Sequence, residues 1–332
     1  MKPKIALLAI HPAVVEMVLD PAALKDMEKT VELRRATPEL WKSGWRPDPD
    51  VEVLVTGWGT PKLDDQALRG MPRLTGVFHA AGSVRDLVSE EVWSRGLAVV
   101  SAADANNERV ADFVAAQILL ALKGTHRARA FMREQRRLPG FAAGPGSDRQ
   151  TIGLVSFGSI ARKVRERLRS LNADVVVWDP YVSDEDLASA GVRRTDNLAE
   201  LFGACAVVSV HAPLIPGVTE KMIGRELIDA MPRGATLLNT SRGAILDESA
   251  IIQVLQERLD LFAILDVTWP EPPADDSPLY DLPNVLLTGH TAGAVGSECR
   301  ALGRLVADEV ARFASGAPLR HAISRDEAAI RA

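Results

Sequence analysis

The sequence predicts an α/β protein with two doubly wound parallel sheets, each covered by helices. Short apolar, β-branched runs alternate with longer segments of helical spacing, which is typical of parallel sheets with helices on both faces. These runs form two series that divide near residue 106. The chain has 332 residues, enough for two domains with sizeable cores.

Each series supplies the strands of one sheet. The first series predicts strands at 4–10, 51–57, 74–80 and 97–102, and the second predicts strands at 151–157, 174–179, 206–211, 235–240, 262–267 and 284–290. A helix over 108–124 is expected to open the second domain and to end at Gly124. Residues 136–150 are rich in glycine and proline and predict an irregular arm. The helical pattern at 297–316 is expected to cross back to the first domain.

Composition excludes several classes of partner. The formal net charge is −5, so no overall basic field attracts nucleic acid or an anionic membrane. No apolar run approaches 18 residues, and the N-terminal run resembles a buried strand more than a targeting segment. The two cysteines form no motif, which suits a reducing cytoplasm. We therefore expect a cytoplasmic protein without nucleic-acid, membrane or metal partners.

The turn "SFGSIA" at 156–161 follows an expected strand and opens an expected helix. The dinucleotide fingerprint is G-x-G-x-x-G, and here Ser156 and Ala161 flank the middle glycine, Gly158. That glycine lets the backbone approach a pyrophosphate, whereas small residues can serve the two outer roles. Asp179 ends the next strand, where a carboxylate accepts the ribose hydroxyls of NAD and repels the 2′-phosphate of NADP. The sequence predicts NAD on this turn; an ordinary strand-to-helix turn is the alternative.

Polar residues follow the strands of the second series. They include His211, which begins the run 211–213, and Arg242, Asp266, Glu271 and His290. Singly, each suits a solvated loop or a helix cap. Together they lie at the carboxyl edge of one sheet, where ligands bind in open α/β folds.

These side chains suit one reaction in particular. An arginine grips a substrate carboxylate with two parallel hydrogen bonds. A histidine moves the proton of a hydroxyl or carbonyl, and a neighbouring carboxylate orients it and stabilises its protonated form. We therefore predict hydride transfer between NAD(H) and C2 of a small 2-hydroxy acid or 2-oxo acid.

Four motifs, "HAPL", "NTSRG", "LDV…PEP" and "GHTAG", appear in the order and spacing of a known family. The chain resembles the NAD-dependent D-2-hydroxyacid dehydrogenases, which include glyoxylate/hydroxypyruvate reductases and D-3-phosphoglycerate dehydrogenase. The resemblance implies catalytic roles for Arg242, Glu271 and His290, with Arg242 also holding the substrate carboxylate. It implies further substrate contacts at Gly82, Ser83 and Asn106. The cofactor contacts that it implies, together with those of the turn, are Ser156, Gly158, Ser159, Ile160, Asp179, His211, Ala212, Pro213, Thr219, Thr240, Asp266, Ala292 and Gly293.

The sequence departs from the family pattern at several positions. Ser156 and Ala161 replace glycines, and Gly289 replaces the proline that usually precedes the catalytic histidine. The loop "HAAGSVRDL" at 79–87 stands where the family has a glycine-rich loop whose amides hold the substrate carboxylate, and it lacks the usual second glycine. These departures bear on the pocket and on the choice of substrate.

The family fold implies a division of the chain. A flavodoxin-like, split substrate domain is expected from 1–106 plus 298–332, and a Rossmann-type NAD domain from 107–297. A homodimer is expected through the NAD domains, with the helix over 107–124 and an arm at 125–150 embracing the partner.

Three alternatives stay open at this stage. A formate dehydrogenase-like enzyme shares the pattern, but its histidine usually partners a glutamine, and Glu271 argues against it. D-3-phosphoglycerate dehydrogenase is an alternative within the class, although no basic pair marks a phosphate pocket. A non-enzymatic NAD-binding scaffold, like the corepressors of this fold, retains the same three residues.

Overall fold

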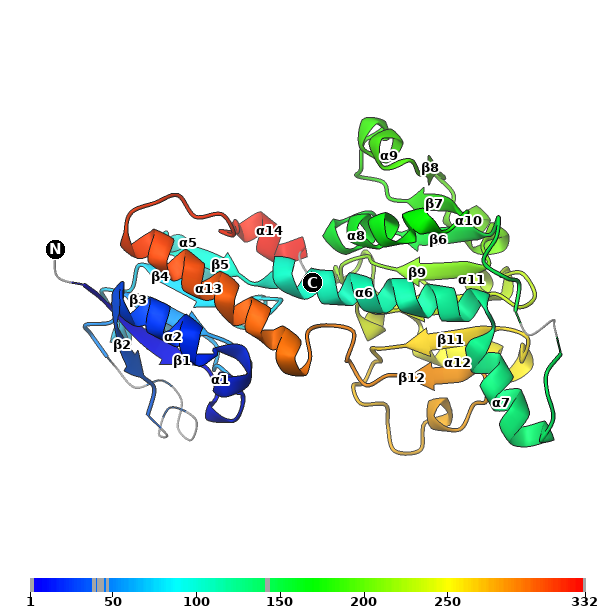
Figure 1. Ribbon diagram of the computed structural model, residues 1–332, viewed down its shortest axis with the longest axis horizontal. Helices are drawn as coiled ribbons and strands as arrows, with labels where there is room; N and C mark the ends of the chain where they lie inside the picture. The colour runs from blue at the N-terminus through cyan, green and yellow to red at the C-terminus, as the bar shows by residue number, and fades with distance from the viewer. Residues whose placement is uncertain (1–2, 38–39, 41–44, 46–47, 141–143, 331–332) are drawn as a thin grey trace. The chain divides into compact units, whose positions relative to one another are not determined.

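The computed structural model describes residues 3–37, 40, 45, 48–140 and 144–330 (Figure 1). The chain forms two compact units, one from Met1–Asn107 with Ala294–Ala332 and one from Glu108–Gly293. Each unit contains a single, fully parallel sheet. The predicted α/β class with two doubly wound sheets is confirmed.

Unit 1 has a five-stranded sheet in the flavodoxin-like order β2-β1-β3-β4-β5. Its strands are β1 (Lys4–Ala9), β2 (Val31–Arg35), β3 (Val53–Thr56), β4 (Gly76–His79) and β5 (Ala98–Ser101). The sequence missed β2, because "VELRR" carries three charges and lies at the edge of the sheet. The helices of this unit are α1 (Pro12–Val18), α2 (Pro21–Glu28), α4 (Asp65–Gly70), α5 (Glu90–Ser94), α13 (Cys299–Ala314) and α14 (Arg325–Ile330), with the 3-10 turn η4 (Gly296–Glu298).

Alternation along the strands builds two cores, one on each face of this sheet. In β1, Ile5 and Leu7 point to the face covered by α4, α5 and α14, whereas Ala6 and Leu8 point to the face covered by α1, α2 and α13. Both faces are buried, so the strand is apolar throughout, as parallel strands usually are. Each large buried side chain contributes about 1.5–3 kcal/mol relative to exposure.

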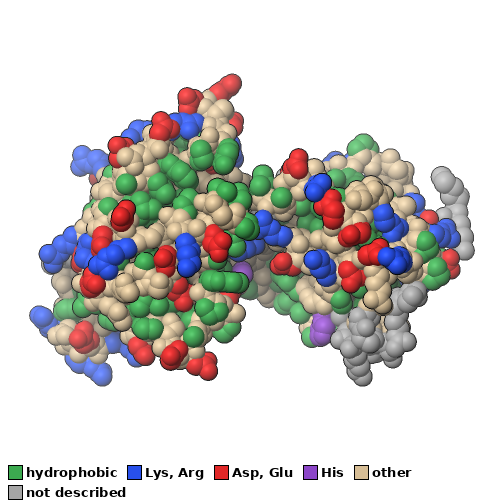
Figure 2. Space-filling view, turned by 180° about the vertical axis from the view of Figure 1, so that it is seen from behind, with side chains coloured by type: hydrophobic (Ala, Val, Ile, Leu, Met, Phe, Trp, Pro, Cys, Tyr) green, Lys and Arg blue, Asp and Glu red, His purple; other side chains and the backbone are tan. Residues whose placement is uncertain are grey.

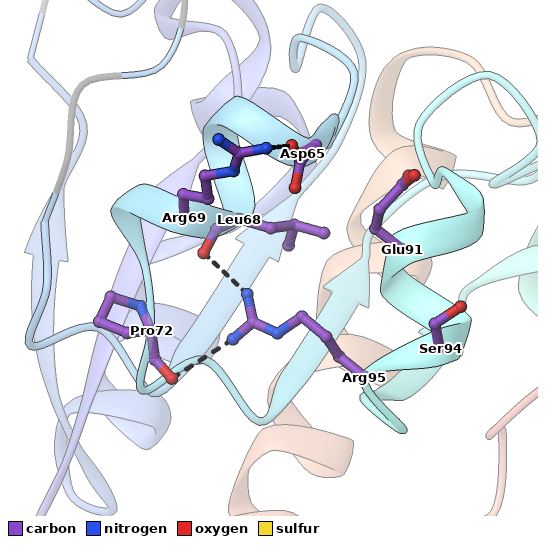
Figure 3. A pocket seen from close by; sticks show the side chains of 7 residues that line it. All are labelled: Asp65, Leu68, Arg69, Pro72, Glu91, Ser94 and Arg95. Atoms are coloured by element: carbon purple, nitrogen blue, oxygen red, sulfur yellow. Dashed lines mark hydrogen bonds and ion pairs between the residues drawn. The ribbon is translucent and has the colours of Figure 1, made fainter.

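Helix α4 is closed at both ends by side chains. Its first turn is capped by Asp64, whose carboxylate accepts from the Ala67 amide at 2.9 Å. At its other end Arg95 donates to the carbonyls of Leu68 (2.7 Å) and Pro72 (3.4 Å) (Figure 3). The lining of the cavity of about 420 Å³ beside Arg95 includes none of the predicted site residues.

Unit 2 has a seven-stranded sheet in the order β12-β11-β10-β9-β6-β7-β8. Strand order reverses between β6 and β9, as in the dinucleotide-binding fold. The strands are β6 (Thr151–Val155), β7 (Asp174–Trp178), β8 (Arg193–Arg194), β9 (Val207–Val210), β10 (Thr236–Asn239), β11 (Phe262–Leu265) and β12 (Val285–Leu287). Only the two-residue β8 was not predicted.

The helices of unit 2 cover both faces of its sheet. One core packs α10, α11 and α12 against the strands, and the other packs α6, α8 and α9. The helices are α6 (Ala103–Leu122), α7 (Thr125–Gln135), α8 (Ser159–Arg167), α9 (Asp184–Ala190), α10 (Leu198–Ala204), α11 (Arg225–Asp229) and α12 (Glu248–Glu257), with 3-10 turns η1 (Leu168–Ser170), η2 (Gly243–Ile245) and η3 (Pro278–Tyr280).

The two compact units lie close to the predicted domains, 1–106 with 298–332 and 107–297. The first boundary falls after Asn107 rather than after 106, inside α6, which begins at Ala103 instead of 108. The second boundary falls after Gly293 rather than after 297. Residues 294–297 stay with unit 1 because the Ala294 amide donates to Asn106 Oδ1 at 2.9 Å, and the Ala294 carbonyl accepts from the Cys299 thiol.

The surface carries charges of both signs. On the face drawn in Figure 2, acidic and basic side chains intermingle. Within the described part of the chain, no helix is both long and apolar enough to cross a membrane. The same residues contain no cluster of three or more histidine, cysteine or acidic side chains arranged to hold a metal ion.

Candidate active site

The carboxyl ends of six strands of unit 2 lie in register along one edge of the sheet. Ladder partners at their carboxyl ends are Trp178–Val155, Val155–Val210, Val210–Asn239, Asn239–Leu265 and Leu265–Leu287. The residue after each strand end is therefore aligned along one edge. Those residues are Asp179, Ser156, His211, Thr240, Asp266 and Thr288. Five of the six were predicted site residues, and Thr288 was missed.

The turn after β6 has room for a phosphate group. A Cβ atom built on Gly158 has no described atom within 4 Å, so the space beside the turn is open. The first amides of α8 lack acceptors within the helix, and such amides bind anions. Ser156 adopts φ 74, a conformation that favours glycine and explains why the fingerprint has glycine there. Ala161 is fully buried, so a small residue meets the packing requirement.

Asp179 has four donors from the protein itself. Its Oδ2 accepts from the Phe157 amide (2.7 Å) and the Ser156 hydroxyl (3.1 Å). Its Oδ1 accepts from the amides of Tyr181 (2.8 Å) and Val182 (3.2 Å). The carboxylate thus ties the fingerprint turn to the segment after β7. The Ser156 hydroxyl, absent from a glycine, offsets part of the strain at that position.

Arginine from a neighbouring strand also reaches this corner. Arg194 donates to the carbonyl of Asp179 (3.0 Å) and pairs with Asp184 (2.6 Å). No arginine follows Asp179 immediately in the sequence. Arg194 is 15 residues away and reaches this corner because it lies on strand β8, which was not predicted.

The loop after β9 is organised internally. Thr219 accepts from the Ile215 amide (2.7 Å) and donates to the Pro213 carbonyl (2.6 Å). His211 lies 3.0 Å from the Ser209 hydroxyl, and burial lowers the pKa of His211 to about 4. His211 is therefore neutral at pH 7 and serves the loop rather than proton transfer.

The turn after β10 carries Arg242. Asn239 shapes it by accepting from the Ser241 amide (3.0 Å) and by donating to the Arg242 carbonyl (3.0 Å). A Cβ on Gly243 would stand 2.0 Å from the carbonyl carbon and oxygen of Thr268. Only glycine permits this approach, which presses the Arg242 turn against the loop that carries Glu271. The arrangement explains the glycine in "NTSRG".

Asp266 organises the loop that leads to His290. Its Oδ1 accepts from the hydroxyl of Thr288 (2.6 Å) and the amide of Thr291 (2.8 Å), and its Oδ2 accepts from the amide of Ala292 (3.1 Å). The His290 amide donates to the Asp266 carbonyl at 2.7 Å. One of about four acceptor positions of the carboxylate is left for a ligand amide.

His290 and Glu271 meet directly. His290 Nδ1 lies 2.6 Å from Glu271 Oε1, and both side chains are partly exposed. Gly289 and His290 have φ 67 and φ 58. Proline cannot adopt the value at 289, so the glycine that departs from the family pattern fits the turn as it is built here. A cavity of about 340 Å³ is lined by Glu271 and Gly289 together with Asp266, Thr268 and Tyr280, and its lining does not include His290.

Unit 1 holds the predicted substrate-side residues. Gly82 and Ser83 follow β4 and are partly exposed. A Cβ on Gly82 would stand 3.4 Å from the side-chain nitrogen of Asn106. The three residues therefore lie together within this unit.

The residues present fit a dinucleotide. The space beside Gly158 is open, so a ligand can approach the backbone there. In addition, the buried hydroxyl of Thr240 at the strand edge has no hydrogen-bond partner within the described chain. The sequence missed Asn239, Thr268, Thr288 and Thr291, whose roles come from packing and backbone geometry. The one available signal was the polar residue at the end of each apolar run.

The family described as "D-isomer specific 2-hydroxyacid dehydrogenase, NAD binding domain" matches residues 115–292. The chain belongs to this family. The match spans the sheet edge described above, from α6 to the residues after His290, so unit 2 is the family's NAD-binding domain. The resemblance found from the motifs is thereby confirmed.

Relatives extend the similarity over most of the chain. It is 31% identical over 307 residues to (S)-sulfolactate dehydrogenase of Chromohalobacter salexigens, covering 89% of this chain and 95% of that protein. It is 29% identical over 307 residues to D-3-phosphoglycerate dehydrogenase of Methanocaldococcus jannaschii, covering 90% of this chain and 57% of that protein. The chain thus spans about half the length of the phosphoglycerate dehydrogenases that it matches. The crystal structure of the TT0316 protein from Thermus thermophilus aligns with a TM-score of 0.77 at 26% identity, covering 96% of this chain and 100% of that one.

Proposed function

We propose that the chain is an NAD-dependent oxidoreductase that moves a hydride between the cofactor and C2 of a small D-2-hydroxy acid or its 2-oxo acid. The observation that carries the proposal is the His290–Glu271 pair at 2.6 Å, in the same unit as the Arg242 turn. An acid–base pair and an arginine that can bind a carboxylate, both in unit 2, suit this reaction. The family and the names of the two relatives support it.

The site residues would bind the cofactor, bind the substrate and move the proton. NADH, when bound, supplies the hydride. The turn at Gly158 with the first amides of α8 would hold the pyrophosphate, and Asp266 the carboxamide. Asp179 would hold the ribose by exchanging one or more of its four protein donors for ribose hydroxyls. Arg242 binds the substrate carboxylate. In reduction His290 gives a proton to the carbonyl oxygen, and in oxidation it takes the proton of the C2 hydroxyl.

Glu271 and Asp266 position the histidine. Glu271 accepts from Nδ1 and leaves Nε2 for the substrate. Asp266 holds the backbone around His290 through the Thr291 and Ala292 amides.

The test is NADH consumption with glyoxylate, hydroxypyruvate, pyruvate and 3-phosphohydroxypyruvate. We expect turnover of at least one of these acids and formation of the matching D-2-hydroxy acid. NADH binding without turnover of any 2-oxo acid would favour the corepressor-like scaffold. Turnover of formate with NAD⁺ would favour the formate dehydrogenase alternative.

We propose a homodimer formed through unit 2. Leu119 and Leu120 on α6 and Met132 on α7 are exposed by 36–46%, and Leu138 in the arm is 78% exposed. Exposed apolar side chains on α6, α7 and the arm would be covered in an interface with a second copy of the chain. Residues 141–143 of the predicted arm lie outside the described residues. Light scattering should give the dimer mass for wild type and a lower mass for Leu138→Asp, whereas a monomeric wild type refutes the interface.

We also propose a cytoplasmic location. Both cysteines are buried and free, and burial raises the pKa of Cys205 to about 12, so its thiol is unreactive. Such thiols suit a reducing compartment. Fractionation of the native host should recover the chain with cytoplasmic markers, and recovery with the membrane or the medium would contradict this.

A further inference from the structure

The loop that carries Glu271 has few backbone donors of its own. Residues 269–273 read "WPEPP", and proline has no N–H group. Within these residues, only the amides of Trp269 and Glu271 can therefore donate a hydrogen bond. Proline also fixes its own φ angle, so the backbone on both sides of Glu271 has little freedom. The direction of the Glu271 side chain thus depends on how the ends of this short segment are held.

Glu248 binds the first of these two amides. The Trp269 amide donates to Glu248 Oε2 at 3.0 Å. Glu248 is the first residue of α12 and directly follows Asp247, which caps that helix. Burial raises the pKa of Glu248, whereas the hydrogen bond from Trp269 lowers it. The amide therefore offsets part of the cost of burying this carboxylate, and the contact links α12 to the loop just before Glu271.

The same loop is also held on either side of this bond. A Cβ on Gly243 would stand 2.0 Å from the carbonyl group of Thr268, so the two backbones are in close contact there. The Thr268 hydroxyl donates to the Pro270 carbonyl at 2.8 Å and closes the turn around Trp269. Beyond Glu271, the hydroxyl of Tyr280 donates to the carbonyl of Pro273 at 3.0 Å.

Gly243 and Glu248 both belong to the segment that follows Arg242. The 3-10 turn η2 begins directly after Arg242, and α12 begins three residues after that turn ends. The segment 242–248 therefore meets the Glu271 loop at two points, one at Thr268 and one at Trp269. The first point is a steric contact that limits how closely the loop can approach. The second is a directional hydrogen bond that keeps the loop from moving away.

We propose that Glu248 is a positioning residue, which fixes the Glu271 side chain for proton transfer through its hydrogen bond with the Trp269 amide. The inference rests on the proposed function and adds a residue that acts through Glu271 rather than on the substrate. Glu271 Oε1 lies 2.6 Å from His290 Nδ1, and both side chains are partly exposed. A short contact between exposed side chains requires that both backbones are held. Asp266 holds the backbone of His290, and Glu248 provides the corresponding restraint for Glu271.

Matched substitutions separate this hydrogen bond from the stability of α12. Glu248→Ala removes the acceptor of the Trp269 amide, whereas Glu248→Gln keeps a carbonyl oxygen near the same place. Val254→Ala, on the buried face of α12, lowers stability without touching the loop. The first measurement is amide hydrogen exchange of the segment 267–273 in the cofactor-free protein. The others are the thermal midpoint, the dissociation constant of NADH, and kcat/KM in reduction and in oxidation.

Glu248→Ala should speed hydrogen exchange in 267–273 and lower reductive kcat/KM, each about tenfold, the size of one lost hydrogen bond to a charged group. Reduction should lose more than oxidation, as it does when Glu271→Gln removes the carboxylate itself. In a Glu271→Gln background, Glu248→Ala should change kcat/KM less than about twofold, because residues that act through one another are not additive. Glu248→Gln should stay within about threefold of wild type. NADH binding should not change, and Val254→Ala should lower only the thermal midpoint.

Unchanged hydrogen exchange in Glu248→Ala overturns the proposal, because the Trp269 amide then does not depend on this carboxylate. A tenfold loss that persists in the Glu271→Gln background overturns the route through Glu271. An equal loss of kcat/KM in Glu248→Gln or in Val254→Ala also overturns it. A wild type that turns over no 2-oxo acid, or a Glu271→Gln variant with wild-type kcat/KM in both directions, refutes the proposed function and the inference together.

Discussion

His290 Nδ1 and Glu271 Oε1 lie 2.6 Å apart, although 19 residues separate them in the chain. Each follows a different strand of the same sheet, β12 and β11, whose ends pair at Leu287 and Leu265. The side chains are 54% and 39% exposed, so solvent screens part of their attraction. The pair therefore matters for the orientation and charge of the ring more than for stability.

Glu271→Gln should impair reduction more than oxidation near neutral pH. The amide keeps the size of the side chain but removes the negative charge that faces Nδ1 while His290 gives its proton to the substrate. General acid catalysis is worth about 10²–10⁴-fold, so losing its support should lower reductive kcat/KM by roughly 10–100-fold. The check is kcat/KM in both directions at one pH. Asp275→Asn, an exposed carboxylate of the same loop, is the control and should have no effect. Equal losses in both directions would show that Glu271 does not support the acid form of His290.

Asp179→Ser should weaken NADH binding and relax the preference over NADPH. The substitution removes both the acceptor for ribose and the charge that repels a 2′-phosphate, and Arg194 lies beside the vacated position. The measurement is the dissociation constant of each cofactor by fluorescence titration. Asp196→Asn, an 89% exposed neighbour of Arg194, is the control. Wild type that binds NADPH as tightly as NADH would refute this role.

Gly243→Ala should be far more damaging than Gly224→Ala. An added Cβ at 243 meets the Thr268 carbonyl at 2.0 Å, whereas one at 224 meets no described atom within 4 Å. Overpacking of this kind costs about 1–3 kcal/mol, and it also separates Arg242 from the Glu271 loop. The measurements are the free energy of unfolding in urea and kcat/KM, each compared between the two variants. Equal behaviour of the two would mean that the close approach has no consequence.

His79 should make the protein acid-sensitive. Its pKa is about 4 in the folded chain and about 6.5 when unfolded, so the unfolded state takes up the proton first as pH falls. Its share of stability is present above pH 6.5 and is lost towards pH 4, by about 3 kcal/mol at most. His211 titrates similarly, so the comparison is with His79→Gln, which retains only the His211 contribution. The free energy of unfolding should fall less between pH 7 and pH 4.5 in that variant. Parallel falls would show that His79 is protonated without cost in the folded state.

Much of the fold followed from local pattern. Apolar runs such as 151–155 and 262–265 are buried on both faces, and their composition alone indicates a parallel sheet. The edge strands β2 and β8 were missed because charged residues such as Arg34 and Arg193 lie at their exposed positions. The pattern of apolar residues in a sequence reflects burial, and edge strands bury few of their side chains.

The sequence allowed the residues of the site to be predicted, but not the contacts that they make with one another. Arg242 and His290 follow strand ends, which is visible in the sequence. The four donors around Asp179 and the three around Asp266 come from backbone amides and short hydroxyls, whose direction depends on turn geometry. Likewise, the need for Gly243 arises from Thr268, a residue distant in sequence.

The central claim is that Arg242 binds the carboxylate of the substrate. The most direct test compares kcat/KM for a 2-oxo acid and for its uncharged methyl ester, in wild type and in Arg242→Ala. Loss of a charge-assisted, two-point contact should cost roughly 3–5 kcal/mol, or about 10²–10⁴-fold, for the acid. The ester should change little, NADH binding should persist, and Arg242→Lys should rescue poorly because lysine lacks the planar fork. An Arg242→Ala variant that still prefers the acid to the ester as strongly as wild type does would contradict the account.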